Sequence, residues 1–266
     1  MFRNITLGQY YPGESVIHKL DPRTKLLATL LYIIGIFFID NLWGALFVTA
    51  VLGVVIYLSK VPFSFMVRGL KGIVIVLLIA AAFNLFMTPG VPLVKFGIFK
   101  VTEEGIINAL IMTFRMIYLI VGSSVLTLTT TPNDLTNGLE KGLHFLTYVK
   151  VPVADIAMMM SIALRFIPIL MEETDKIMKA QMARGASFDT GNIIQKAKSM
   201  IPLLVPLFVN AFKRAYDLAN AMEARCFDGS EKRSKMKPLK YARRDAFGYG
   251  FAFLGLVGCI LFGKLF

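Results

Sequence analysis

The sequence predicts an all-α integral membrane protein with about five transmembrane helices and a cytoplasmic domain of three amphipathic helices, two of them long and either lying across the cytoplasmic face or crossed beneath it. Of the 266 residues, 56% are hydrophobic, more than the roughly 45–50% of soluble domains. Mean hydropathy is +0.65, and long apolar runs alternate with short polar segments. Between residues 132 and 245, apolar residues instead recur at steps of three and four, with charged residues on the other faces.

The net charge of +12 does not indicate a nucleic-acid-binding protein, because so apolar a chain has too little polar surface for a solvated globule. We interpret the basic residues as orientation signals and cytosolic contacts. The cysteines, Cys226 and Cys259, and the histidines, His18 and His144, lie too far apart in sequence to suggest a disulfide framework or a metal site. The polar N-terminal segment lacks the features of a cleavable signal peptide.

Residues 26–58 predict a hairpin of two membrane helices. The only charged residue in this run is Asp40, in the segment "FFIDNLWG", which resembles a tight polar turn. The first helix has a clear start in "LDPRTK", where Asp21 is the expected N-cap and Pro22 the first helical residue.

Three further membrane helices are expected downstream. Residues 59–72 form a basic connector, 73–87 the third span, and 88–105 an irregular loop. The fourth span covers 106–131, and the last covers 246–266.

Arg115 interrupts the fourth span. A charge at that depth costs about 2.5–3.5 kcal/mol on insertion scales. Two interpretations stay open: the side chain reaches the outer interface or a neighbouring helix, or it takes part in substrate passage.

Lysine and arginine are concentrated before the first span and in the 59–72 connector, which places both segments in the cytosol by the positive-inside rule. The expected organisation is therefore 1–131 with the N-terminal segment and four membrane helices, 132–245 as a cytoplasmic domain, and 246–266 as the last membrane helix.

The cytoplasmic domain begins at "TTPNDL", where Thr131 is the expected N-cap and Pro132 the first helical residue. Two long helices follow, at about 152–185 and 192–226. Each ends in an Ala-Arg pair followed by a small residue, within "KAQMARGAS" and "NAMEARCFD".

An arginine in the last helical turn can simply complement the helix macrodipole, for about 0.3–1 kcal/mol. Two such arginines, each on a slim helix tip at the end of a long arm, favour insertion into two carboxylate-lined grooves of partner proteins. The candidate site residues are Ala183, Arg184, Gly185, Ala224, Arg225 and Cys226.

The sequence shows no catalytic machinery. The segment "GCILFGKL" at 258–265 matches GxxxxGK, but Leu265 stands where a magnesium-binding Ser or Thr belongs, at the end of a predicted span. We therefore expect no enzyme, no bound cofactor and no metal in this chain.

At near full length the chain resembles the transmembrane T component of energy-coupling factor (ECF) transporters, vitamin and metal importers of the ATP-binding-cassette class. The resemblance rests on "GQYYPGESVIHKLDPRTKLL", "TTPNDL", "ARG", "ARC" and "YARRD", in this order on this hydropathy profile. It implies a multi-pass protein of a prokaryotic cytoplasmic membrane whose residues 132–245 form a coupling domain.

The resemblance also implies partners. Residues 183–185 would dock into one ATPase subunit and 224–226 into a second, and these ATPases would bind the ATP and magnesium. The apolar faces of the long helices, with methionines such as Met159, would support a substrate-binding membrane S component. Cys226 departs from the family pattern, which has glycine there.

Two other functions remain open. The chain could be a self-contained membrane enzyme or channel with a cytosolic helical regulatory domain. It could also be a membrane-anchored scaffold whose basic helices bind anionic lipid.

Overall fold

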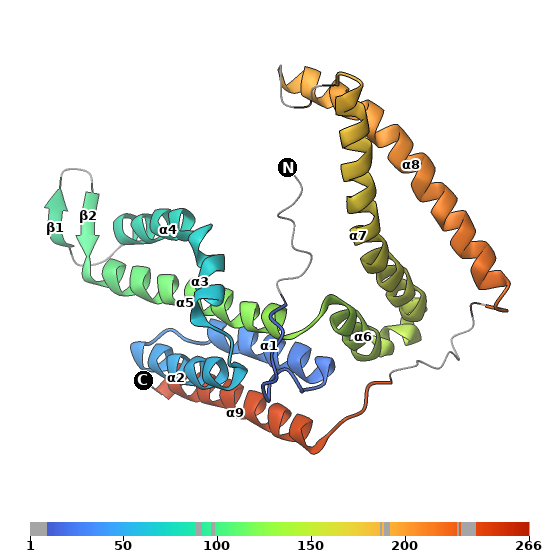
Figure 1. Cartoon of the computed structure of the whole chain (residues 1–266). Helices are drawn as coiled ribbons and strands as arrows, with labels where there is room; N and C mark the ends of the chain where they lie inside the picture. The colour runs from blue at the N-terminus through green and yellow to red at the C-terminus, as the bar shows by residue number, and fades with distance from the viewer. Residues whose placement is uncertain are drawn as a thin grey trace. The chain divides into compact units, whose positions relative to one another are not determined.

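The computed structural model describes residues 10–88, 92–96, 99–186, 188, 192–227, 229 and 238–265. The chain divides into two compact units (Figure 1). The first, here called the membrane unit, comprises Gly8–Gly142 and Leu239–Phe266. The second, here called the paired-helix unit, contains Leu143–Pro238 together with the first residues of the chain.

The elements of the membrane unit are α1 (Pro22–Phe37), α2 (Leu42–Ser59), α3 (Phe63–Lys71), α4 (Val74–Met87), β1 (Pro92–Phe96), β2 (Phe99–Thr102), α5 (Glu103–Thr129), α6 (Pro132–Gly142) and α9 (Arg243–Leu265). Those of the paired-helix unit are the 3₁₀ helix η1 (His144–Val149), α7 (Val153–Ala183) and α8 (Ile193–Glu223). The all-α prediction is confirmed, apart from one short antiparallel β1–β2 hairpin.

The predicted helix starts are confirmed at atomic detail. The Asp21 side chain accepts from the Arg23 N–H at 3.0 Å, with Pro22 as first helical residue. At the start of α6, the Asp134 N–H donates to Thr131 Oγ1 at 3.2 Å, and the Thr131 hydroxyl donates to the Asp134 carboxylate at 2.7 Å.

The segment expected as an irregular loop, 88–105, differs from the prediction. It contains the β1–β2 hairpin, and α5 begins at Glu103. Thr102 is the N-cap of α5, since its Oγ1 accepts from the Gly105 N–H at 3.1 Å. The two lysines and two glutamates of this segment made it resemble a loop, whereas strand pairing and capping by Thr102 give it regular structure.

By length and composition, α2, α5, α7 and α9 could each cross a membrane, and the bent pair α3–α4 could supply a fifth span. With 16 residues, α1 is shorter than α2, α5, α7 and α9, although it packs against α5, α6 and α9. Within 132–245, the region expected to be cytoplasmic, α7 is also long and apolar enough to cross a membrane, because its charges are concentrated in its C-terminal half.

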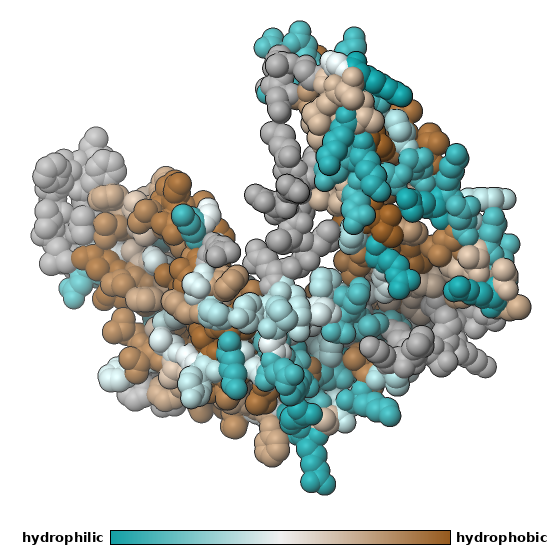
Figure 2. All heavy atoms as spheres, viewed as in Figure 1, coloured by the Kyte–Doolittle hydropathy of each residue, from teal (hydrophilic) through white to brown (hydrophobic). Residues whose placement is uncertain are grey.

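The core of the membrane unit lies among α1, α2, α3, α5 and α9. Ile36, Val48, Met66 and Leu128 are almost fully buried there. The outward faces are apolar as well, which Figure 2 shows as brown spheres over α4 and α5. On α4, Ile75 is 70% exposed, as expected for a helix surrounded by lipid rather than water.

The unit boundary falls after α6 rather than before it. Gly138 of α6 lies so close to α1 that an added Cβ would stand 2.9 Å from the Cβ of Pro22. Consequently α6, which the sequence grouped with the long helices of 132–245, packs with the membrane unit.

Candidate functional site

The paired-helix unit consists mainly of α7 and α8, which run antiparallel. Glu173 of α7 joins them in the middle, accepting from Asn210 Nδ2 at 2.6 Å and from Arg214 Nε at 3.1 Å. Near the end of α7, Gln181 Nε2 lies 3.5 Å from Pro202 O. Each helix has 31 residues, so the predicted pair of long helices is present.

The first Ala-Arg motif lies at the end of α7. The Ala186 N–H donates to Gln181 O at 3.0 Å, and the Gly185 N–H donates to Met182 O at 2.9 Å. These two bonds define a Schellman motif, in which the residue after the cap adopts the left-handed conformation. That residue is Gly185, at φ +87°, and Arg184 is the cap.

The second motif repeats this geometry after α8. The Phe227 N–H donates to Met222 O at 3.1 Å, and the Cys226 N–H donates to Glu223 O at 2.9 Å. Cys226 adopts the left-handed conformation at φ +54°. In this hydrogen-bond pattern, Arg225 holds the position that Arg184 holds in the first.

The departure of Cys226 from glycine therefore leaves the turn intact. Nothing lies within 4 Å of a Cβ added at Gly185, so glycine is favoured there by its backbone conformation and not by crowding. A non-glycine residue in the left-handed region costs roughly 1–2 kcal/mol of conformational free energy. Cys226 adopts this conformation despite that cost, so the second turn has the same backbone geometry as the first.

Both arginines are exposed, and neither makes an ion pair or hydrogen bond with its side chain to another residue that the structure describes. Ala183 and Ala224 beside them are also exposed. Each tip thus presents a planar cation on a narrow helix end, a shape suited to bidentate binding of a carboxylate.

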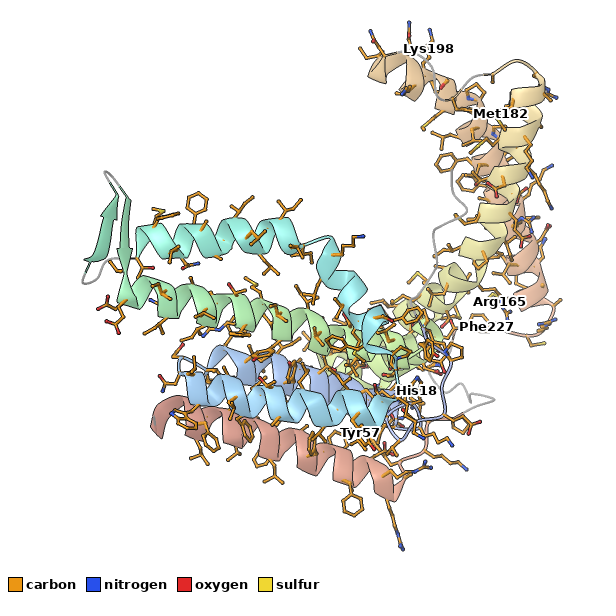
Figure 3. The ribbon with its side chains drawn as sticks, turned by 60° about the vertical axis from the view of Figure 1, so that its left-hand side comes forward. His18, Tyr57, Arg165, Met182, Lys198 and Phe227 are labelled. Carbon is orange, nitrogen blue, oxygen red and sulfur yellow. The ribbon has the colours of Figure 1, made fainter. Side chains whose placement is uncertain are left out.

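The two tips lie far apart along α8. The Gln181–Pro202 contact places the end of α7 beside the first third of α8, whereas Arg225 follows the last turn of α8. At 1.5 Å per residue this separates them by roughly 30–35 Å. In Figure 3 Met182 and Phe227, next to the two tips, are labelled at opposite ends of the pair.

An exposed apolar stripe runs along α8. Its residues recur at steps of three and four and are all exposed: Ile201, Leu204, Phe208, Phe212 and Tyr216. On α7, Met159 and Met160 are exposed too. Exposed aromatic and aliphatic residues aligned on one helix face indicate a contact surface for another apolar protein.

Arg115 of α5 binds the turn between α1 and α2. Its guanidinium lies 3.0 Å from Asp40 Oδ1 and donates to the Ile39 carbonyl. Of the two interpretations left open by the sequence, this geometry favours contact with a neighbouring element. The pair resembles a surface ion pair, since the Asp40 side chain is 78% exposed.

Sequence reasoning missed a buried polar link between α1 and α9. The Asp245 carboxylate accepts from the Asp21 N–H at 2.8 Å and from the Ala242 N–H at 2.7 Å, with the Thr24 hydroxyl at 3.4 Å. Asp245 is 3% exposed. An acidic residue three positions after Ala242, before an apolar run, is the signal that could have indicated its capping role.

The phosphate-loop lookalike at 258–265 lies inside α9, where Gly258 packs against the Phe47 ring. A continuous helix cannot cradle phosphates as a loop does, which confirms its rejection. In the described part of the chain, no cluster of three or more His, Cys, Asp or Glu residues could hold a metal ion.

Residues 13–237 match the family described as "Cobalt transport protein" (CbiQ). The energy-coupling factor transporter transmembrane protein EcfT of Clostridium kluyveri is 52% identical over 247 residues, 92% of each chain. Its namesake in Ruminiclostridium cellulolyticum is 48% identical over 266 residues, 100% of both chains. That of Bacillus subtilis is 47% identical over 247 residues, 92% of this chain and 93% of the relative.

The chain belongs to the CbiQ family and is an EcfT-like transmembrane component of an ECF transporter. It is therefore a multi-pass membrane protein of a multisubunit complex.

Proposed function

We propose that this chain couples two ATPase subunits to a substrate-binding membrane subunit, the S component, for uptake of a vitamin or another micronutrient. The ATPases bind ATP and magnesium, and this chain contributes no catalytic residue. The observation that carries the proposal is the repeated Schellman motif, which presents Arg184 and Arg225 in the same way at two separated tips.

Each tip suits one groove of one ATPase. The functional unit of the tip is an arginine flanked by alanine and a left-handed residue, as in residues 183–185 and 224–226. The exposed guanidinium lacks an acidic partner among the described residues of its own chain. A carboxylate in the groove of the ATPase would form an ion pair with it. In this arrangement the paired-helix unit and the N-terminus face the cytosol.

The apolar stripe on α8 suits the S component. Charged side chains lie on other faces of α8, as with Arg214, which binds Glu173 of α7. Exposed methionines of α7 add side chains that repack readily, so one surface could accept several different S components.

Motion would pass through the helix pair. When ATP closes the two ATPases, their grooves move the tips apart or together. Glu173 of α7 accepts two hydrogen bonds from α8, so the two crossed helices move together. An S component bound to the apolar stripe of α8 tilts when they move. This motion reaches the S component only if both arginine tips stay bound in the grooves of the ATPases.

Purification under mild detergent tests the proposal. We expect the tagged chain to retain two ATPase subunits and one S component, and to hydrolyse no ATP once the ATPases are removed. Activity of the isolated chain would favour a self-contained enzyme or channel. Membrane binding that depends on lipid charge and salt, with no ATPase retained, would favour the scaffold.

A further inference from the structure

The membrane unit encloses an apolar cavity of about 610 Å³ among α1, α2, α5 and α9. Small residues make room for it. On α9, Gly250 and Gly255 line the cavity, and a Cβ added at either would meet nothing within 4 Å. Ala28 of α1 also lines it.

Aromatic packing joins α2 and α9 at one end of the cavity. At that end the rings of Phe47 and Phe262 stack with centroids 5.1 Å apart, and Gly258 packs on Phe47. Toward the other end, Leu58 of α2 and Phe247 of α9 both line the cavity and are exposed. The cavity therefore opens between these two helices on the outside of the unit.

The cavity has the length of one bilayer leaflet. Along α1 its lining extends from Thr24 to Gly35, or roughly 17 Å at 1.5 Å per residue. Half of a hydrocarbon core of about 30 Å is about 15 Å. The volume and depth suit an acyl chain better than a compact polar solute.

A cation lies at the end where α1 and α9 begin. Arg244 lines the cavity there, is exposed, and has no ion pair with its side chain among the described residues. Lys25, the other cation that lines the cavity, is already bound, since its Nζ donates to His18 O at 3.1 Å and to Thr129 O at 2.9 Å. Arg244 is thus available for an external anion at the level of the lipid headgroups.

We propose that this cavity binds one anionic phospholipid from the leaflet beside Arg244, with acyl chain between α2 and α9 and phosphate at the Arg244 guanidinium. An apolar slot one leaflet deep and an unpaired cation at its headgroup end are complementary to that ligand. The site is separate from the arginine tips, so it does not rest on the coupling function.

The test is native mass spectrometry of the assembled transporter, first delipidated and then titrated with phosphatidylglycerol or phosphatidylcholine. We expect wild-type protein to retain one phosphatidylglycerol, in preference to phosphatidylcholine. Arg244→Gln should weaken phosphatidylglycerol binding by about fivefold and remove the preference. Gly255→Leu should fill the cavity and eliminate the retained lipid.

The matched control is Gly53→Leu on α2, where an added Cβ also meets nothing within 4 Å and the residue does not line the cavity. This variant should bind lipid as the wild type does. The proposal fails if Gly255→Leu and Gly53→Leu bind equally, which would indicate only annular lipid, or if phosphatidylcholine binds as tightly as phosphatidylglycerol. It also fails if a partner helix occupies the cavity.

Discussion

Reversing both tip charges, in the double variant Arg184→Glu with Arg225→Glu, is expected to abolish ATP-driven substrate uptake. Loss of one partner from a desolvated charge pair costs about 2–5 kcal/mol, which corresponds to roughly 30-fold to several thousand-fold in affinity per tip. A glutamate facing a carboxylate adds repulsion to that loss. Uptake into proteoliposomes and the amount of copurified ATPase should therefore fall together.

The matched control is Lys176→Glu with Lys213→Glu. It changes the net charge by the same amount, on exposed positions of α7 and α8 away from the tips. Uptake should stay near the wild-type level. If the arginine variant transports normally and retains both ATPases, the coupling role of the tips is wrong; if the lysine control is equally inactive, overall charge and not the tip is responsible.

Asp245→Ala is expected to lower the free energy of unfolding of the membrane unit by about 2–5 kcal/mol. The substitution leaves the buried Asp21 N–H and the partly buried Ala242 N–H without their acceptor, since Asp245 itself is 3% exposed. Each buried group left unsatisfied costs about 1–3 kcal/mol. Denaturant titration of the purified protein in mixed micelles measures the change.

Asp245→Asn supplies the first control, because its single amide oxygen can still accept one of the two N–H groups, and it should lose about half as much stability. Asp217→Ala, an exposed position on α8, should change stability by no more than about 0.5 kcal/mol. An unfolding midpoint for Asp245→Ala equal to that of wild type would show that the link contributes nothing.

Helix ends were predictable from the sequence because capping is local. Asp21, Thr131 and Gly185 each hydrogen-bond within a few residues of themselves or adopt a conformation that their residue type favours. For the same reason, the paired tips could be located before any fold was known.

Long-range features were not predictable in this way. Asp245 and Asp21 are 224 positions apart, and only the packing of α1 against α9 brings them together. The left-handed conformation of Cys226 was hidden as well, because cysteine has no preference for it, and only comparison with Gly185 suggests it. The cavity likewise depends on where α2 and α9 touch.

Photo-crosslinking from the two tips tests the central claim most directly. The photoreactive residue p-benzoylphenylalanine is placed at Ala183 or Ala224, the exposed neighbours of the arginines, and the assembled transporter is irradiated. We predict an adduct with one ATPase subunit from Ala183 and with the other from Ala224, and none from Gly53 on α2. Adducts with lipid or with the S component at either tip would contradict the account.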